Sequence, residues 1–219
     1  MRKFDFYEFA GVIVPGTVFL LGAAFCSPPI KQAVFEQNLS IGKSAISLIA
    51  AYGLGHLIAA LGNLIEWVLW RLCGGWPTDW PRSGKHDLVS PKQISSVNAA
   101  LKTRLALEFS GGFQQLSESD WFGVVRQVYA DVAATPAVQR VDTFNGNYGL
   151  NRGLAAALLA LSLLVVLTHG FALWELLLVS GAAVAVYRMH RFARHYAREL
   201  FVQFLQRSAS SGNTTGDEK

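Results

Sequence analysis

The chain has 219 residues, of which 52% are hydrophobic and only 16% are charged, and its mean hydropathy is +0.30. This composition excludes an ordinary soluble domain and predicts an integral membrane protein, with a formal net charge of +4. Two cysteines cannot build a disulfide framework, and the sequence contains no phosphate-binding glycine loop, nucleophile motif or metal-ligand cluster. We therefore expect no enzymatic activity, no catalytic residue, no cofactor and no metal.

Four apolar segments have roughly the length of a membrane-crossing helix. They run from about Phe9 to Phe25, Ser44 to Leu72, Leu154 to Thr168 and Phe171 to Tyr187. Basic residues are dense between positions 71 and 152 and after position 187, whereas the connection between the first two segments holds only Lys31 and Lys43. Because positively charged loops stay in the cytoplasm, this asymmetry predicts a multi-pass all-α protein with four transmembrane helices and both termini cytoplasmic.

Aromatic residues precede and open the first segment, where they suit the boundary between water and lipid. They are Phe4, Phe6, Tyr7 and Phe9. Within the segment, Pro15 and Gly16 predict a kink, because proline removes a helical hydrogen bond and clashes with the preceding turn. This kink serves either packing or a hinge for gating. A short external loop is expected next, between Cys26 and Lys43.

The second segment carries polar residues along one seam of a helix. A helical repeat of about 3.5 residues places six side chains on this seam. They are Tyr52, His56, Ala59, Asn63, Glu66 and Trp70, and Gly55 and Gly62 run beside them. Polar side chains at bilayer depth are costly and tend to face a bundle interior or a water-filled path. The alternatives are that Asn63 bonds to another helix of the same chain and that Glu66 extends to the interface.

We interpret His56, Asn63 and Glu66 as pore-lining residues of a homo-oligomer, because four helices in one chain leave little room for a pore. Cyclic symmetry places the same helix of each copy around the axis, and a tetramer is the first guess. Glu66 would then form a carboxylate ring that favours cations. A hydrophobic gate would come from Leu57, Leu61 or Leu64.

The composition changes to that of a small soluble helical module between Ser90 and Gly149. Ser90 and Pro91 form a good cap and first turn, and this helix is expected to stop at residues 110–112. A second helix is expected to begin near Ser117 or Ser119 and to end at Pro136. About 60 residues are few for an independent core, so we expect this module to oligomerise or to dock on the membrane helices.

Asparagine and glycine are dense between residues 145 and 149, which favours turns before the third segment. Exposed amides there, near Arg152, could form an anion-binding nest; the alternative is a plain linker. The third and fourth segments meet at residues 168–170, which predicts a tight helical hairpin. Glu175 is expected to pair with His169 or to reach the interface.

The last helical pattern continues beyond the fourth segment and places arginines on roughly one face. They are Arg188, Arg191, Arg194 and Arg198. Such a juxtamembrane helix either anchors to anionic lipid or, with Arg152, binds an anionic cytoplasmic ligand such as a nucleotide or single-stranded DNA. The predicted parts are membrane helices 1 and 2 (1–73), a cytoplasmic helical module (74–150), a membrane hairpin (151–187), a basic helix (188–208) and a disordered tail (209–219).

Three stretches, together with the arginine-rich end, resemble the small multi-span membrane components of bacterial anti-phage defence operons. They are FDFYEFAGVIVPG, YGLGHLIAALGNLIEW and FNGNYGLNRG. Resemblance to the membrane effector of Hailong systems implies a homo-oligomeric inner-membrane channel gated by a DNA oligomer that a partner nucleotidyltransferase makes. Resemblance to the four-span component of Kiwa systems implies a membrane oligomer that recruits a cytoplasmic DNA-binding partner.

These observations lead to two hypotheses. The first is a homo-oligomeric ion channel and antiviral effector that an anionic nucleotide or oligonucleotide gates from the cytoplasm. The second is a non-conducting scaffold or sensor that holds a soluble defence partner, encoded in the same operon, at the membrane.

Overall fold

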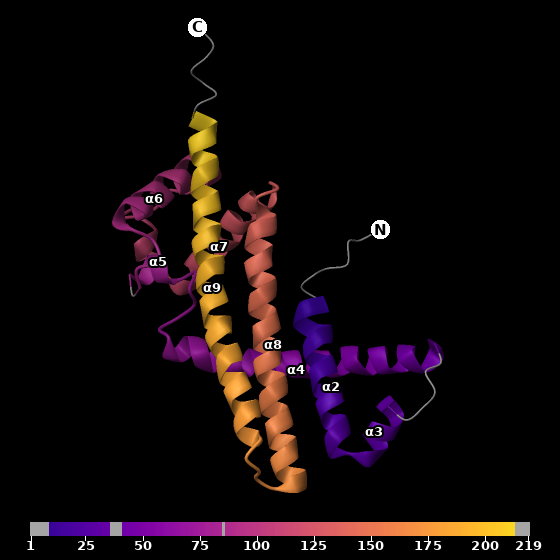
Figure 1. The fold of residues 1–219 in the computed structure, drawn as a ribbon. Helices are drawn as coiled ribbons and strands as arrows, with labels where there is room; N and C mark the ends of the chain where they lie inside the picture. The colour runs from indigo at the N-terminus through magenta and orange to yellow at the C-terminus, as the bar shows by residue number, and fades with distance from the viewer. Residues whose placement is uncertain (1–8, 36–40, 85, 213–219) are drawn as a thin grey trace. The chain divides into compact units, whose positions relative to one another are not determined.

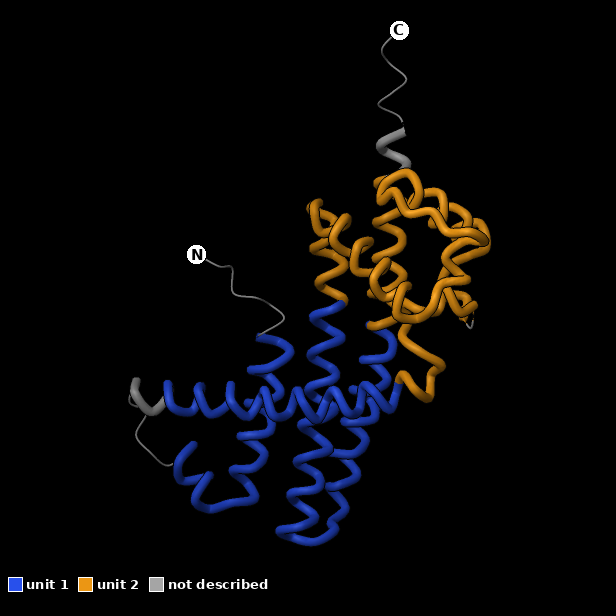
Figure 2. Tube along the Cα trace, turned by 180° about the vertical axis from the view of Figure 1, so that it is seen from behind, with its two compact units in different colours: residues 1–69, 145–192 blue, residues 70–144, 193–219 orange. Residues whose placement is uncertain are grey.

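The computed structural model describes residues 9–35, 41–84 and 86–212. Every element in these ranges is a helix, which agrees with the predicted all-helical class. The expected aromatic belt at Phe4, Phe6 and Tyr7 and most of the expected tail lie outside the described residues. The chain forms two compact units: residues 1–69 with 145–192, and residues 70–144 with 193–219 (Figure 2).

Three helices of the described chain are long and apolar enough to cross a membrane, which supports the predicted membrane protein. The candidate spans are Phe9–Cys26, Ala45–Leu72 and Val138–His169. The fourth expected segment is divided between a connection and the first turns of a much longer helix. The first unit contains η1 (Phe9–Ile13), α2 (Val14–Cys26), α3 (Pro28–Phe35), most of α4 (Ile41–Leu72), most of α8 (Val138–His169) and the beginning of α9 (Glu175–Gly212).

Two expected irregular segments are helical instead. The connection after Cys26 contains α3, and the asparagine- and glycine-rich residues 145–149 lie within the continuous helix α8, so the prediction of turns there is wrong. Asn151 satisfies its side chain within α8 by donating to the Asn147 carbonyl at 2.7 Å. Gly153 faces Pro15 so closely that a β-carbon would lie 2.4 Å from the proline ring. Gly153, just after this segment, therefore permits the close packing of α2 on α8.

The predicted hairpin between the third and fourth apolar segments is present. Helix α8 ends at His169, Gly170 adopts a φ of +76°, and α9 begins at Glu175. The side chain of Glu175 is buried at 1% exposure and accepts a hydrogen bond from Ser162 at 2.8 Å. It neither pairs with His169 nor reaches the surface, because the start of α9 packs directly on α8.

Helices α2, α8 and α9 lie side by side in the first unit, and α4 runs across them (Figures 1 and 2). Near its start α2 contacts α8 at Gly153, and further along it contacts Leu161, so the two helices run in the same direction. Leu158 of α8 contacts α9 at Gly181, as the return of the hairpin requires. At the crossing with α4, a small apolar core surrounds Ile58.

The second unit begins with a connector and two capped helices. It contains α5 (Trp80–Ser83), α6 (Pro91–Leu105), η2 (Phe113–Gln115), α7 (Glu118–Ala133), the first turns of α8 and the end of α9. The predicted start of α6 is confirmed, because Ser90 forms a complete capping box with Gln93. Helix α6 stops earlier than expected, at Ala106, whose φ of +53° ends the helix. Ser117 caps α7 as predicted.

The core of the second unit is completed by α9. The Trp121 ring stacks on Phe113 at a centroid distance of 4.6 Å and faces Phe201 of α9 at 6.1 Å. Leu200 and Phe204 of α9 are also fully buried. The length of this module predicts that it cannot form a core alone. Helix α9, at the far end of the chain, supplies the missing apolar surface.

A partly buried ion-pair network fastens α9 to this core. Both carboxylate oxygens of Asp131 accept from Arg104 at 2.5 Å, and Arg104 also donates to the Phe204 carbonyl at 3.1 Å. Arg207 of α9 lies 3.3 Å from the same carboxylate. One carboxylate of α7 therefore neutralises two guanidinium groups, one from α6 and one from α9.

Replacing Asp131 with alanine is expected to lower the free energy of unfolding by about 3 kcal/mol, because a largely buried guanidinium loses its partner. Glu108→Ala is the matched control, because it breaks the ion pair between Glu108 and Lys102. Their side chains are 69% and 60% exposed, respectively, so the loss of this pair is expected to cost less than about 1 kcal/mol. Unfolding in detergent followed by tryptophan fluorescence measures both. Equal losses in the two variants would contradict the structural role of Asp131.

Candidate functional site

The crossing of η1 and α2 with α4 is built on two glycines. A β-carbon on Gly16 would lie 2.0 Å from the Ala51 carbonyl oxygen, and one on Gly55 would lie 2.3 Å from the Val12 carbonyl oxygen. Both neighbours are backbone atoms, which no change of rotamer can move away. The helices therefore approach each other as closely as only glycine allows, as is common where small residues mediate packing in membranes.

The crossing of α4 with α8 holds a buried ion pair. Gly62 leaves room for the Arg152 side chain, whose Cγ would lie 3.1 Å from a β-carbon at this position. One turn further along α4, the Arg152 guanidinium Nη1 donates to the Glu66 carboxylate Oε2. The two side chains are 15% and 9% exposed, and Arg152 also lies 5.9 Å from the Tyr148 ring. This pair joins two helices that are far apart in the sequence.

This ion pair changes how the predicted pore and ligand residues are interpreted. Glu66 is expected to line a pore and Arg152 to bind an anion, but the structure brings their charges together inside one chain. Inside a packed crossing each of these charges compensates the other, and removing either one would leave the remaining charge buried without a counter-charge. A signal for this pairing exists in the sequence: Glu66 is the single acid of α4, Arg152 is the basic residue at the start of the apolar run of α8, and the two signs are opposite.

His56 and Asn63 lie apart from this pair, on the exposed surface of α4. The packed strip of α4 is displaced by about one residue from the predicted polar seam. The packed strip consists of Ala51, Gly55, Ile58, Gly62 and Glu66. On the adjoining strip, the His56 ring meets the Tyr52 ring edge to face at 4.6 Å. Of the three predicted pore residues, the structure thus buries one and exposes two.

The four predicted arginines of α9 are all exposed, on the side of the helix opposite its buried residues. Met189, Ala193 and Ala197 form the buried side. Two of the arginines contact aromatic rings: Arg188 lies 5.3 Å from the Phe192 ring, and Arg194 lies 6.0 Å from the Trp80 ring. The exposed arginines are Arg188, Arg191, Arg194 and Arg198, and we name them the arginine face. Arg152 is not part of it.

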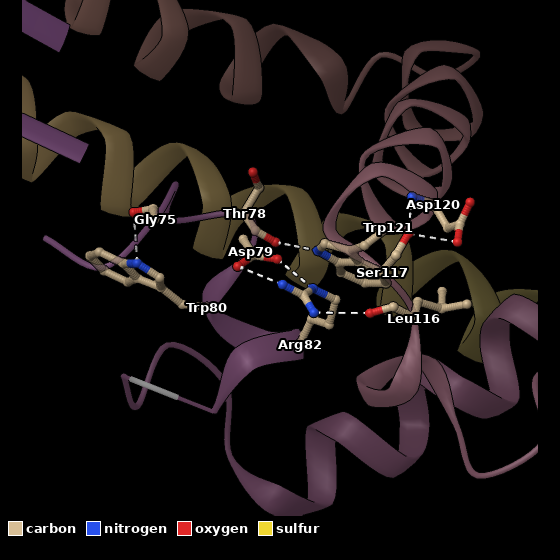
Figure 3. Close-up of polar contacts among 9 residues, drawn as sticks. All are labelled: Gly75, Thr78, Asp79, Trp80, Arg82, Leu116, Ser117, Asp120 and Trp121. Atoms are coloured by element: carbon tan, nitrogen blue, oxygen red, sulfur yellow. Dashed lines mark hydrogen bonds and ion pairs between the residues drawn. The ribbon is translucent and has the colours of Figure 1, made fainter. Parts of the chain in front are cut away.

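The connector before α6 is held in the second unit by a set of polar contacts that the sequence does not indicate (Figure 3). Arg82 binds Asp79 at 2.6 Å and donates to the Leu116 carbonyl at 2.9 Å. Hydrogen bonds to Asp79 raise the pKa of Arg82 further above its usual range. The Trp121 indole donates to the Thr78 carbonyl at 2.8 Å. Trp80 is also buried here, at 1% exposure.

Comparison with family models, with curated proteins and with solved structures found no match to this chain. The described side chains contain no group of three histidine, cysteine, aspartate or glutamate residues placed to hold a metal ion. The features available for function are the arginine face, the exposed polar strip of α4 and the two glycine crossings.

Proposed function

We propose that this protein is a membrane-anchored sensor or scaffold of a bacterial defence system, and that its arginine face binds an anionic cytoplasmic ligand or partner. In this proposal α2, α4, α8 and the apolar start of α9 are four membrane-associated segments, in the inner membrane, with both termini cytoplasmic. Ligand or partner binding at α9 then takes place next to the membrane surface.

The observation that carries this proposal is the exposure of four arginines on one side of α9. Between Arg188 and Arg198 the sequence contains no aspartate or glutamate. The next acid, Glu199, is engaged by Arg140 at 3.2 Å and by Gln203 at 2.7 Å. Guanidinium groups bind phosphate and carboxylate oxygens through paired hydrogen bonds, so a row of them suits a polyanion such as an oligonucleotide or an acidic protein surface.

A salt series tests this proposal with a fluorescent single-stranded DNA oligomer as the probe and purified full-length protein. Each phosphate contact that is lost should reduce the slope of log affinity against log salt by about 0.7. Replacing Arg194 and Arg198 with glutamine is therefore expected to weaken binding and to lower this slope. Arg126→Gln, on the exposed surface of α7, is the matched control. Equal effects from the control, or none from the double variant, would refute recognition by the arginine face.

Ion conduction by a homo-oligomer is the second candidate function, favoured by the exposure of His56 and Asn63 within the long apolar helix α4. Copies arranged around an axis would place this strip along a polar path. Glu66 is not part of this path, because it pairs with Arg152. Planar-bilayer recording tests the candidate: Asn63→Leu should abolish conductance, whereas Leu57→Ala on the adjoining strip should preserve it. Electrically silent wild-type protein would exclude it.

A further inference from the structure

Helix α4 has two properties that a simple membrane-crossing helix does not combine. It runs across α2, α8 and α9 instead of beside them (Figures 1 and 2). It is also the least buried of the three candidate spans: 22% of its most apolar stretch is buried, compared with 39% for the span Phe9–Cys26 and 44% for α8. If α2 and α8 enter a bilayer along its normal, a helix that crosses both of them lies in the plane of the membrane.

Contacts of α4 define which of its sides points into the bilayer. Ile58 packs against Ala156 and Ala157, and against Val18 and Phe19 of α2. These partners lie further along α2 and α8, toward their apolar ends, than Pro15 and Arg152 do. The Ile58 side of α4 therefore points toward the hairpin end of the unit, where α2 and α8 are largely apolar.

The opposite side of α4 carries its exposed polar residues. Tyr52, His56 and Asn63 lie on this side and are exposed. Because successive residues of an α-helix are separated by about 100°, these three lie across the helix from Ile58. They therefore point toward the end from which α8 enters the unit. The polar strip and the apolar core of the crossing thus lie on opposite sides of α4.

The outer surface of α4, away from α2 and α8, is apolar. Leu57, Leu61, Leu64 and Val68 are exposed on it at 66%, 47%, 59% and 43%. An exposed surface of leucine and valine of this kind suits contact with lipid acyl chains. Trp67, between these strips, is a residue type that favours the boundary between headgroups and acyl chains.

We propose that α4 lies along the membrane surface, with Tyr52, His56 and Asn63 among the headgroups and the leucine surface against the acyl chains. The Glu66–Arg152 pair then sits at the level of the membrane boundary, where a buried charge pair is less costly than at the bilayer centre. From Arg152 to His169, α8 extends for about 26 Å at 1.5 Å per residue, close to the roughly 30 Å of a hydrocarbon core.

This arrangement has a consequence for the path of the chain. Both ends of α4 lie at the same membrane surface, and the α8–α9 hairpin enters the bilayer from that surface and returns to it. This inference does not rest on the proposed function, and it assigns His56 and Asn63 to lipid headgroups rather than to a pore.

Cysteine labelling with a membrane-impermeant maleimide tests the placement of α4 in full-length protein. Single cysteines are introduced after Cys26 and Cys73 are replaced with alanine, in sealed vesicles prepared in both orientations. The test positions are Ala45 and Arg71 near the ends of α4, His56 and Asn63 on the polar strip, and Leu57 and Leu64 as the matched controls beside them. All six side chains are exposed.

We expect the Ala45→Cys, His56→Cys, Asn63→Cys and Arg71→Cys variants to react in the same vesicle orientation and the two leucine variants to be protected. Reaction of the Ala45→Cys and Arg71→Cys variants from opposite sides would overturn the proposal, because α4 would then cross the bilayer. Protection of both end positions in both orientations would also overturn it. Neither outcome bears on binding at the arginine face, so the two proposals fail independently.

Discussion

Replacing Gly55 with alanine is expected to lower the free energy of unfolding by about 3 kcal/mol or more, because a single methyl group must displace backbone. The new β-carbon would lie 2.3 Å from the Val12 carbonyl oxygen, so η1 and α4 must separate along the crossing. Gly16→Ala meets the same obstacle at the Ala51 carbonyl and should behave in the same way. Unfolding in mixed detergent micelles, followed by circular dichroism, measures the loss.

Gly53 provides the matched control two residues away on the same helix. No atom lies within 4 Å of a β-carbon at Gly53, so alanine is accommodated without rearrangement. Alanine is also the better helix former, by about 0.5–1 kcal/mol, and Gly53→Ala should be neutral or slightly stabilising. If Gly55→Ala and Gly53→Ala gave the same stability, the close crossing of α4 on η1 and α2 would be wrong.

Removing one partner of the Glu66–Arg152 pair is expected to cost about 3–5 kcal/mol, because the remaining charge stays buried without compensation. Glu66→Gln leaves the Arg152 guanidinium inside the crossing of α4 and α8 without a counter-charge. The double variant Glu66→Gln with Arg152→Gln carries no uncompensated charge and should recover most of the loss. A double-mutant cycle built on the free energies of unfolding of the single and double variants measures the coupling.

The control for this pair is Arg140→Gln. Arg140 binds Glu199 at 3.2 Å, but its side chain is 70% exposed, so its loss should cost less than about 1 kcal/mol. Additive effects of the Glu66 and Arg152 substitutions would show that the two charges do not stabilise each other. The crossing would then depend on the glycines alone.

Local signals were sufficient where the determining interactions are local. The apolar runs indicate a helical membrane protein, and Ser90 and Ser117 mark the starts of α6 and α7 because a capping hydroxyl needs only its own next turn. The continuation of the last apolar pattern predicts that α9 extends far beyond the fourth segment, as it does. These features depend on residues within a few positions of one another.

Glycine and asparagine before Arg152 were misleading because their usual preference for turns assumes exposed backbone. In this chain the segment is packed, and Gly153 is required by the nearness of Pro15. The same limitation applies to the polar seam of α4. Periodicity shows which residues share one side of a helix. It does not show which side faces a neighbouring helix, and a displacement of one residue decides whether Glu66 or Asn63 faces that neighbour. Only the position of the neighbouring helix determines this.

The sequence by itself determined the class of this protein: an all-helical membrane protein with capped helices in a less apolar module and a long arginine-bearing last helix. Only the tertiary structure decided that Glu66 meets Arg152, that α9 completes the core around Trp121 and that α4 runs across its neighbours. The physical reason is range. Hydropathy and capping depend on residues within one or two helical turns. Charge neutralisation and close glycine packing join residues that are far apart along the chain, and no local sequence pattern indicates that they are in contact.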